Sequence, residues 1–259
     1  MTRPVALITG ASSGIGRTYA RALASEYELV LVARRKDRLA ELADELRGVG
    51  AAVDLLPADL STRAGLTAAT DRLAVGDVRL LISNAGAGGL ERLADVDPDE
   101  IDSLLTLNAA ATIELVRAAL PGMLAADEGT IVTVASLLAF STALTDERLP
   151  PRTVYAAAKA AIVAFTRALT AELTGTAIRT QVVCPGIVAT EFGGGYSLDS
   201  PYAMSAQDVV QASLTGLHHG ESICVPGLED QSAALDALVA AENGLTFGGN
   251  RPALATRYK

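Results

Sequence analysis

Aromatic residues and cysteines are scarce in this chain. Its 259 residues include no tryptophan, only 4% aromatic residues and two cysteines, Cys184 and Cys224. Two cysteines so far apart exclude a disulfide framework and a cysteine-rich metal site, so we expect buried, reduced thiols. Because half of the residues are hydrophobic, we expect a sizeable core built mainly from Ala, Val, Leu and Ile.

Positive charge is also in short supply. The chain has 21 Lys and Arg against 30 Asp and Glu, a formal charge of −9, and no basic block. Such a surface repels a phosphate backbone, which argues against a nucleic-acid partner. The longest apolar run, Ile131 to Phe140, is shorter than the ~20 residues of a membrane span. The first one, Val5 to Ile8, runs into a turn at Gly10, unlike a signal peptide. We therefore expect a cytoplasmic protein without a membrane partner.

Short apolar runs alternate with helical patterns through most of the sequence. The runs are continuous more than alternating, as in strands that are covered on both faces. Such alternation predicts parallel pairing through right-handed crossovers, hence an α/β fold with a doubly wound, Rossmann-type parallel sheet of seven strands. The expected strands are Val5–Thr9, Leu29–Ala33, Val53–Leu56, Leu80–Ser83, Ile131–Ala135, Ile178–Cys184 and Ile223–Val225, and the expected helices are 14–25, 36–47, 62–74, 98–125, 153–174 and 206–218.

No linker, repeat or low-complexity block divides the chain. We therefore expect residues 1–259 to form a single dinucleotide-binding domain, with a helical tail at about 228–259. In that tail, Leu235, Leu238 and Val239 are spaced for one more helix, which we expect to end near Asn243-Gly244.

The expected helix at 153–174 has very little polar surface. From Tyr155 to Leu173 its only charged residues are Lys159, Arg167 and Glu172. A helix of this kind is buried on more than one side, and the sheet covers only one. We therefore expect a homodimer or homotetramer in which a second subunit covers the rest; an alanine-rich helix chosen for its propensity alone is the alternative.

A glycine-rich turn, Thr9-Gly10-Ala11-Ser12-Ser13-Gly14-Ile15-Gly16, joins the first expected strand to the first expected helix. Glycines permit a tight turn and close backbone approach, and the helix start offers free N–H groups to a pyrophosphate. This placement indicates a dinucleotide site.

The second strand ends in Arg34 and Arg35, where the adenosine ribose of a dinucleotide arrives. A carboxylate there accepts a bond from a free 2′-hydroxyl, whereas a guanidinium binds a 2′-phosphate. The two arginines favour NADP(H), with Arg34 as the first choice of phosphate ligand because it directly follows the strand. A solvated pair of charges at a helix start is the alternative.

Tyr155 and Lys159 stand four residues apart, so they project from one face of their helix. A nearby ammonium favours the phenolate and brings a tyrosine closer to useful acid–base range. Ser136 ends the fifth expected strand, where its hydroxyl can hold a substrate oxygen. Asn108 lies inside the helix at 98–125, an unfavourable place for asparagine.

These motifs together resemble the short-chain dehydrogenase/reductase family, from Val5 to about Thr190 and more loosely beyond. The resemblance implies that Asn108, Ser136, Tyr155 and Lys159 form a catalytic tetrad, in which the asparagine holds a water of a proton relay and the lysine also binds the nicotinamide ribose. It further implies contacts to the adenine from Asp59-Leu60, a turn beside the cofactor at Asn84-Ala85-Gly86, and contacts to the nicotinamide from Cys184-Pro185-Gly186-Ile187-Val188-Ala189-Thr190. The expected cofactor contacts are Gly10, Ser12, Ser13, Gly14, Ile15, Gly16, Arg34, Arg35, Asp59, Leu60, Asn84, Ala85, Gly86, Tyr155, Lys159, Pro185, Gly186, Val188 and Thr190.

The sequence departs from the family at the substrate side. Family members place the serine about a dozen residues before the tyrosine, whereas Ser136 and Tyr155 are 19 apart, which indicates an insertion at about 145–152. Ser141 or Thr142 restores the usual spacing, but Ser136 matches the end of the strand. Gly193-Gly194-Gly195 and Tyr196 to Tyr202 lie where the family has a mobile substrate segment.

Strand seven is followed by Val225-Pro226-Gly227-Leu228 instead of the family's Asp-Gly-Gly turn. His218 and His219 stand at a helix end, which favours a surface position over a metal site, and no metal is expected.

The expected function is hydride transfer between NADP(H) and a small-molecule carbonyl or alcohol. A non-catalytic NADP(H) sensor or scaffold is one alternative, although all four tetrad positions are kept. An epimerase or dehydratase of the family's extended branch ranks last, because the chain lacks the long C-terminal substrate domain.

Overall fold

The computed structural model describes residues 3–195 and 197–259, so Tyr196 of the expected substrate segment lies outside them. Contacts divide the chain into two compact units, Met1–Pro226 and Gly227–Lys259. The first unit carries the whole sheet and every expected site residue. The second begins where the tail was expected.

Within the described part of the first unit, seven parallel strands form one sheet in the order β3-β2-β1-β4-β5-β6-β7. The strand order reverses between β1 and β4, and doubly wound folds bind ligands in the crevice at the carboxyl ends of the strands at such a point. The sequence predicts every strand to within two residues. The strands are β1 (Val5–Thr9), β2 (Glu28–Ala33), β3 (Val53–Pro57), β4 (Val78–Ser83), β5 (Gly129–Val134), β6 (Ile178–Val183) and β7 (Ile223–Cys224).

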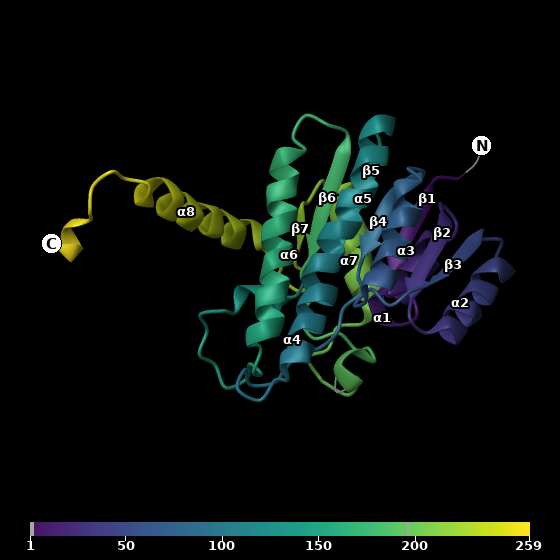
Figure 1. Cartoon of the computed structure of the whole chain (residues 1–259), viewed down its shortest axis with the longest axis horizontal. Helices are drawn as coiled ribbons and strands as arrows, with labels where there is room; N and C mark the ends of the chain where they lie inside the picture. The colour runs from purple at the N-terminus through teal and green to yellow at the C-terminus, as the bar shows by residue number, and fades with distance from the viewer. Residues whose placement is uncertain (1–2, 196) are drawn as a thin grey trace. The chain divides into compact units, whose positions relative to one another are not determined.

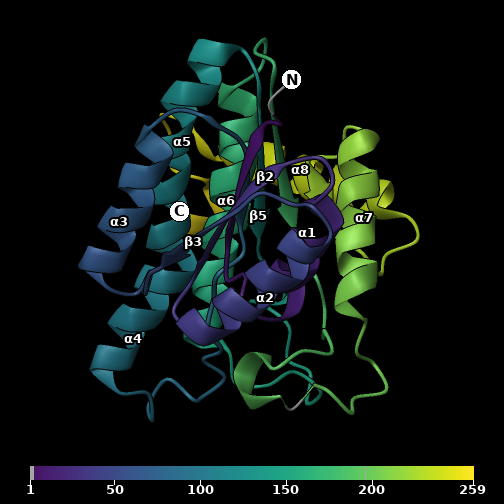
Figure 2. The ribbon, with the colours of Figure 1, turned by 90° about the vertical axis from the view of Figure 1, so that its right-hand side faces the viewer.

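Helices cover both faces of the sheet, as Figures 1 and 2 show. The layer on one face consists of α1 (Gly14–Leu23), α2 (Lys36–Gly48) and α7 (Ala206–His218). The layer on the other face includes α3 (Arg63–Ala74), α5 (Ala111–Ala126) and α6 (Thr153–Glu172), with α4 (Pro98–Leu105) leading into α5. Two layers on one parallel sheet are what the predicted strand–helix alternation requires.

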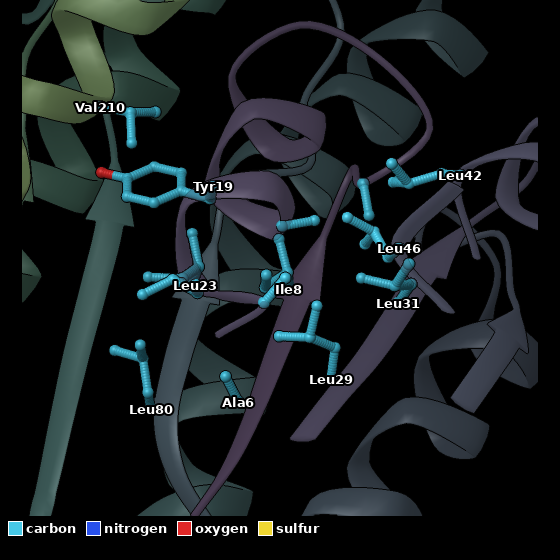
Figure 3. Packing of buried hydrophobic residues seen from close by; sticks show 14 of the residues in the cluster. Ala6, Ile8, Tyr19, Leu23, Leu29, Leu31, Leu42, Leu46, Leu80 and Val210 are labelled. Atoms are coloured by element: carbon cyan, nitrogen blue, oxygen red, sulfur yellow. The ribbon is translucent and has the colours of Figure 1, made fainter. Parts of the chain in front are cut away.

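Successive side chains of the strands point to opposite faces of the sheet, and each face carries one hydrophobic core. Ile8 of β1 packs toward α1 and α2, while its neighbour Leu7 packs toward α3 and α5. Both cores consist mainly of Ala, Val, Leu and Ile, as the composition predicts. Tyr19 of α1 is the large exception; it is fully buried and lies beside Val210 of α7 (Figure 3). Burial raises the pKa of Tyr19.

Two stretches, Pro98–Ala126 and Thr153–Glu172, are long and apolar enough to cross a membrane by length and composition alone. In this fold they belong to the layer that packs on the sheet, α5 against β4 and β5 and α6 against β5 and β6. Their apolar character therefore has an explanation as the inner surface of core helices.

The predicted helix over 98–125 is not continuous. It contains a π turn, η1 (Thr106–Ala110), in which the N–H of Ala111 bonds the carbonyl of Thr106 five residues earlier. Asn108 lies in this turn and bonds the backbone of Ala87 with its side chain. The wider turn accompanies that long-range contact, which helical periodicity does not reveal.

The unit Gly227–Lys259 contains α8 (Gln231–Gly249), which runs past the expected end near Asn243-Gly244. Asp230 caps its start by accepting bonds from the N–H groups of Ser232 and Ala233. Gly244 does not take the left-handed conformation that ends many helices. It stays helical at a cost of about 1 kcal/mol relative to alanine.

Candidate active site

The glycine-rich turn between β1 and α1 has the geometry of a phosphate cradle. Gly10 and Gly14 have φ angles of +67° and +51°, which favour glycine. A Cβ on Gly10 would lie 2.6 Å from Nδ2 of Asn84, so a larger residue does not fit. Ser13, the N-cap of α1, makes no side-chain cap bond within the described part of the chain, which leaves the first N–H groups of the helix available to an anion.

Thr9 connects this turn to the one after β4. Its hydroxyl oxygen accepts bonds from the N–H groups of Asn84 and Ala85, both at 2.9 Å, and Nδ2 of Asn84 donates to the carbonyl of Thr9 at 3.0 Å. The two strands that flank the crevice are thereby joined at their carboxyl ends. Asn84 thus helps to join the two turns, at the position that the sequence analysis predicted to lie beside the cofactor.

Arg34 and Arg35 both lie at the end of β2 but point to different partners. The Arg34 side chain is 66% exposed, and its Nη1 lies 3.7 Å from Oδ2 of Asp59. Arg35 donates from Nη2 to the hydroxyls of Ser12 and Ser13 at 3.1 and 2.6 Å. Arg35 therefore contacts the glycine-rich turn directly, and the preference for Arg34 as phosphate ligand stays a prediction.

Asp59 follows β3 and accepts bonds from the backbone N–H and the hydroxyl of Ser61. Partial burial raises its pKa, but the bonds from Ser61 and the charge of Arg34 outweigh this and lower it overall. Two other expected cofactor contacts pack into the cores, Ile15 on the α1 face and Leu60 on the α3 face. Asp59 is thus a carboxylate near Arg34, while Leu60 is buried in the core.

Tyr155 and Lys159 lie one turn apart on α6 and are both buried. Nζ of Lys159 lies 5.8 Å from the centre of the Tyr155 ring and donates to the carbonyl of Val134, at the end of β5, at 2.9 Å. Burial lowers the pKa of Lys159 to about 8, while Cys184 acts in the opposite direction. A proton-carrying lysine near neutral pH therefore stands beside a tyrosine, as the four-residue spacing predicts.

Asn108 brings the π turn to the same place. It is 1% exposed, and its side chain accepts from the N–H of Ala87 and donates to the carbonyl of Ala87, both at 3.0 Å. A Cβ on Gly86 would lie 2.8 Å from Oδ1 of Asn108 and 3.5 Å from Nζ of Lys159. Asn108, the turn after β4 and Lys159 therefore converge, and only glycine leaves room between them.

The structure separates the roles of the two candidate serines. Ser136 follows β5 and caps the short helix η2 (Leu137–Phe140), its Oγ accepting from the N–H of Leu138 at 3.2 Å. Ser141 is buried; its Oγ donates to the carbonyl of Leu138 at 2.8 Å and accepts from Arg152 at 2.7 Å. Ser141 is thus occupied in holding the loop, which leaves Ser136 as the serine at the strand end.

The turn after β6 closes the site from the other side. The carbonyl of Pro185 accepts from the N–H of Leu137, and Val188 forms an isolated parallel bridge with Met204. Thr190 packs against Gly14, where an added Cβ would lie 3.0 Å from its Cγ2. The segments that the sequence assigned to the pyrophosphate and to the nicotinamide are therefore in contact.

Three residues of this region were not predicted from the sequence. Phe192 stacks at a tilt on Tyr155, with ring centres 6.1 Å apart. Arg152 organises the inserted loop by donating to carbonyls of Ser141, Leu144 and Pro150. Glu191 bonds Arg35, 156 residues away in sequence. None of the three belongs to a short motif, so local sequence carried no signal for them.

Comparisons with known proteins agree with this geometry. A sequence profile of the short chain dehydrogenase family matches residues 4–200. An uncharacterized oxidoreductase of Staphylococcus aureus is 30% identical over 220 residues, which cover 84% of this chain and 92% of that protein.

Two solved structures are similar over essentially the whole chain. The bulky-bulky ketone specific alcohol dehydrogenase from Comamonas testosteroni is 31% identical with a TM-score of 0.89, over 100% of this chain and 99% of the other. A short-chain dehydrogenase from Sphingobium yanoikuyae, in complex with NADPH, is 35% identical with a TM-score of 0.91, over 99% and 100%. With the glycine-rich turn, the strand order and these likenesses established, the chain belongs to the short-chain dehydrogenase/reductase family and is an NAD(P)-dependent oxidoreductase.

Proposed function

We propose that the protein is an NADP(H)-dependent carbonyl reductase or alcohol dehydrogenase that works with Asn108, Ser136, Tyr155 and Lys159. The observation that carries the proposal is the convergence of Tyr155, Lys159 and Asn108 beside the crevice between β1 and β4. Ser136 follows β5 two residues after Val134, whose carbonyl accepts from Lys159. A bound nicotinamide supplies or accepts the hydride at the substrate carbon.

In this proposal the residues of the chain handle the substrate oxygen and its proton. The Tyr155 hydroxyl donates a proton to the carbonyl oxygen in reduction and removes it in oxidation. The Lys159 ammonium stabilises the negative charge that develops on the tyrosine oxygen. Ser136 donates a hydrogen bond that holds the substrate oxygen against the tyrosine, and Asn108 fixes the turn at Ala87 and supports the proton relay.

We further propose NADP(H) over NAD(H), because Arg34 and Arg35 lie at the ribose end of the crevice and Arg35 reaches the glycine-rich turn. The glycines of that turn and the uncapped start of α1 fit a diphosphate. The NADPH complex of the Sphingobium yanoikuyae protein supports this choice.

For the substrate we propose a ketone with two bulky apolar groups. Loops that follow β5 and β6 expose large apolar side chains near the tetrad, and such exposed groups mark binding surfaces. The whole-chain likeness to a bulky-bulky ketone specific enzyme supports the same class. These side chains are Leu137, Phe140, Ile187 and Phe192, each 36–41% exposed.

The test is NADPH oxidation by the purified protein across a panel of ketones and aldehydes of increasing bulk. We expect turnover of diaryl or aryl-alkyl ketones and little turnover of acetone, with Tyr155→Phe as the control for contaminating activity. If NADPH binds but no carbonyl compound on the panel is reduced, the sensor or scaffold function takes precedence.

We also propose a cytoplasmic homodimer or homotetramer. The outer face of α6 is a row of exposed alanines, Ala157, Ala161, Ala164, Ala168 and Ala171, repeating every three or four residues. A small apolar face of this kind suits close helix packing across a symmetric interface. Light scattering at micromolar concentration should give twice or four times the chain mass of 26.6 kDa, and a monomer would contradict the proposal.

A further inference from the structure

One carboxylate occupies the arginine pair at the ribose end of the crevice. Oε2 of Glu191 accepts from Nη1 of Arg35 at 3.0 Å and also from Nη1 of Arg38, one turn further along α2. Arg35 at the same time donates to the hydroxyls of Ser12 and Ser13. Two guanidinium groups, two hydroxyls and one internal anion thus meet at the edge of the glycine-rich turn.

Glu191 is brought there by the segment that follows β6. The residue before it, Thr190, packs against Gly14 of the glycine-rich turn. The residue after it, Phe192, lies against the Tyr155 ring. Glu191 is therefore fixed between the cofactor end and the catalytic end of the site. Its carboxylate faces Arg35 and Arg38, which belong to the connection from β2 into α2.

Arg35 and Arg38 form a basic site of the kind that binds anions, and the Glu191 carboxylate occupies it. The guanidinium groups of Arg38 and Arg35 hold the pKa of Glu191 below its usual value, so the group is a carboxylate at neutral pH. The side chains of Arg35, Arg38 and Glu191 are 40–50% exposed, so a solute anion has access to them. A phosphate monoester with nearly two negative charges competes well against a single carboxylate for such a pair.

Resting on the proposed NADP(H) dependence, we propose that Glu191 is a specificity-determining residue that competes with the 2′-phosphate of the cofactor for Arg35 and Arg38. NADPH must displace the carboxylate, whereas NADH has no group that requires those arginines. Glu191 therefore reduces the preference for the phosphorylated cofactor, and it links that exchange to the segment carrying Phe192.

Isothermal titration of NADPH and NADH into wild type and Glu191→Gln tests this without a known substrate. The amide keeps the size of the side chain but removes its charge. We expect the Kd for NADPH to fall about three- to fivefold, as for an exposed ion pair, and the Kd for NADH to change less than twofold. The matched control is Glu45→Gln, which removes the same charge from a carboxylate paired with Arg17 and Arg21 instead.

An unchanged ratio of the two constants in Glu191→Gln, with NADPH binding intact, would overturn the competition. Weaker NADPH binding in that variant would also overturn it, because the carboxylate would then be positioning the arginines. An equal gain in NADPH affinity in Glu45→Gln would show that the change in Glu191→Gln comes from the net charge of the protein alone. If wild type bound neither cofactor, the proposed function would fail, a result distinct from the other three.

Discussion

The two halves of the carboxyl edge of the sheet are built in different ways. Where β1 and β4 end, hydrogen bonds between Thr9 and both Asn84 and Ala85 join the starts of the two turns. Beyond β5 and β6 the connections to α6 and α7 are long, residues 135–152 and 184–205. Turns joined by such hydrogen bonds preserve one geometry, whereas long loops vary at little cost and carry specificity. The half around β1 and β4, the cofactor half, is thus held by its hydrogen bonds, and we expect the half beyond β5 and β6, the substrate half, to decide the substrate.

The largest expected effect lies where the two halves meet. Tyr155→Phe removes the proposed general acid but leaves the ring against Phe192 and Lys159. We expect turnover to fall by a factor on the order of 10² or more, with NADPH affinity and unfolding midpoint nearly unchanged. Steady-state kinetics on a confirmed substrate measures this. More than half of the wild-type turnover in the variant would remove Tyr155 from the mechanism.

A substitution confined to the cofactor half comes next. Arg34→Asp removes a cation from the ribose end and supplies a carboxylate for a free 2′-hydroxyl. A charge-assisted bond of 1.5–3 kcal/mol corresponds to about a tenfold to hundredfold preference, and because Arg34 is largely exposed we expect the lower end.

Titration of both cofactors should therefore show a wild-type preference for NADPH that Arg34→Asp loses or reverses. Arg35→Asp is the comparison variant, since its arginine contacts Ser12 and Ser13. If only Arg35→Asp changed the ratio, Arg35 and not Arg34 would be the phosphate ligand.

Lys159 makes the stability of the cofactor-free protein depend on pH. Its pKa falls from 10.5 in the unfolded chain to about 8 when folded, so from about pH 8 upward the unfolded state binds more protons and the free energy of unfolding rises with pH. From about pH 8 upward the buried thiols of Cys184 and Cys224, whose pKa values burial raises from 9.0 to about 12, act in the opposite direction.

Between pH 8 and pH 9 Lys159 should contribute a gain of about 1 kcal/mol, measured by denaturant unfolding as the difference between the changes in wild type and in Lys159→Met. Lys159→Met should abolish that gain, whereas Lys36→Met, at an exposed position, should keep it. An equal change in wild type and Lys159→Met over this interval would mean that the lysine is hydrated and not desolvated.

The smallest effect is expected on the substrate half. Arg152→Ala removes the donor that holds the carbonyls of Ser141 and Leu144 and so loosens the inserted loop. We expect the KM for a bulky ketone to rise about threefold while the Kd for NADPH stays constant. The matched control is Arg148→Ala in the same loop, an 89% exposed side chain paired with Asp146. A change in NADPH affinity would show that this loop also acts on cofactor binding.

The features that the sequence predicted correctly are those that depend on neighbouring residues. Each strand is rich in Val, Ile and Leu, and the glycine-rich turn lies within eight residues, so local pattern was sufficient for both. Tyr155 and Lys159 were predictable as a pair because one helix turn separates them. The catalytic roles of these residues remain predictions.

Features that depend on distant partners were not predictable. Asn108, in the π turn, bonds the backbone of Ala87. Glu191 bonds Arg35 and Arg38, which are far from it in the sequence. Likewise, spacing alone favoured Ser141 or Thr142, and it does not reveal that the Ser141 hydroxyl bonds Leu138 and Arg152; the choice of Ser136 stays a prediction. Residue types and local spacing do not encode such pairings.

The π turn also fixes the phase of one helix relative to the next. A regular α-helix turns about 100° per residue. The additional residue in η1 therefore rotates the side chains of α4 about the helix axis by that angle, relative to where an uninterrupted α-helix continuing from α5 would place them. Deleting Ala109 or Ala110 would restore regular hydrogen bonding and yet rotate Leu104 away from its buried position. In this segment a locally better helix and a correctly assembled protein are mutually exclusive, so its length is constrained as strictly as its composition.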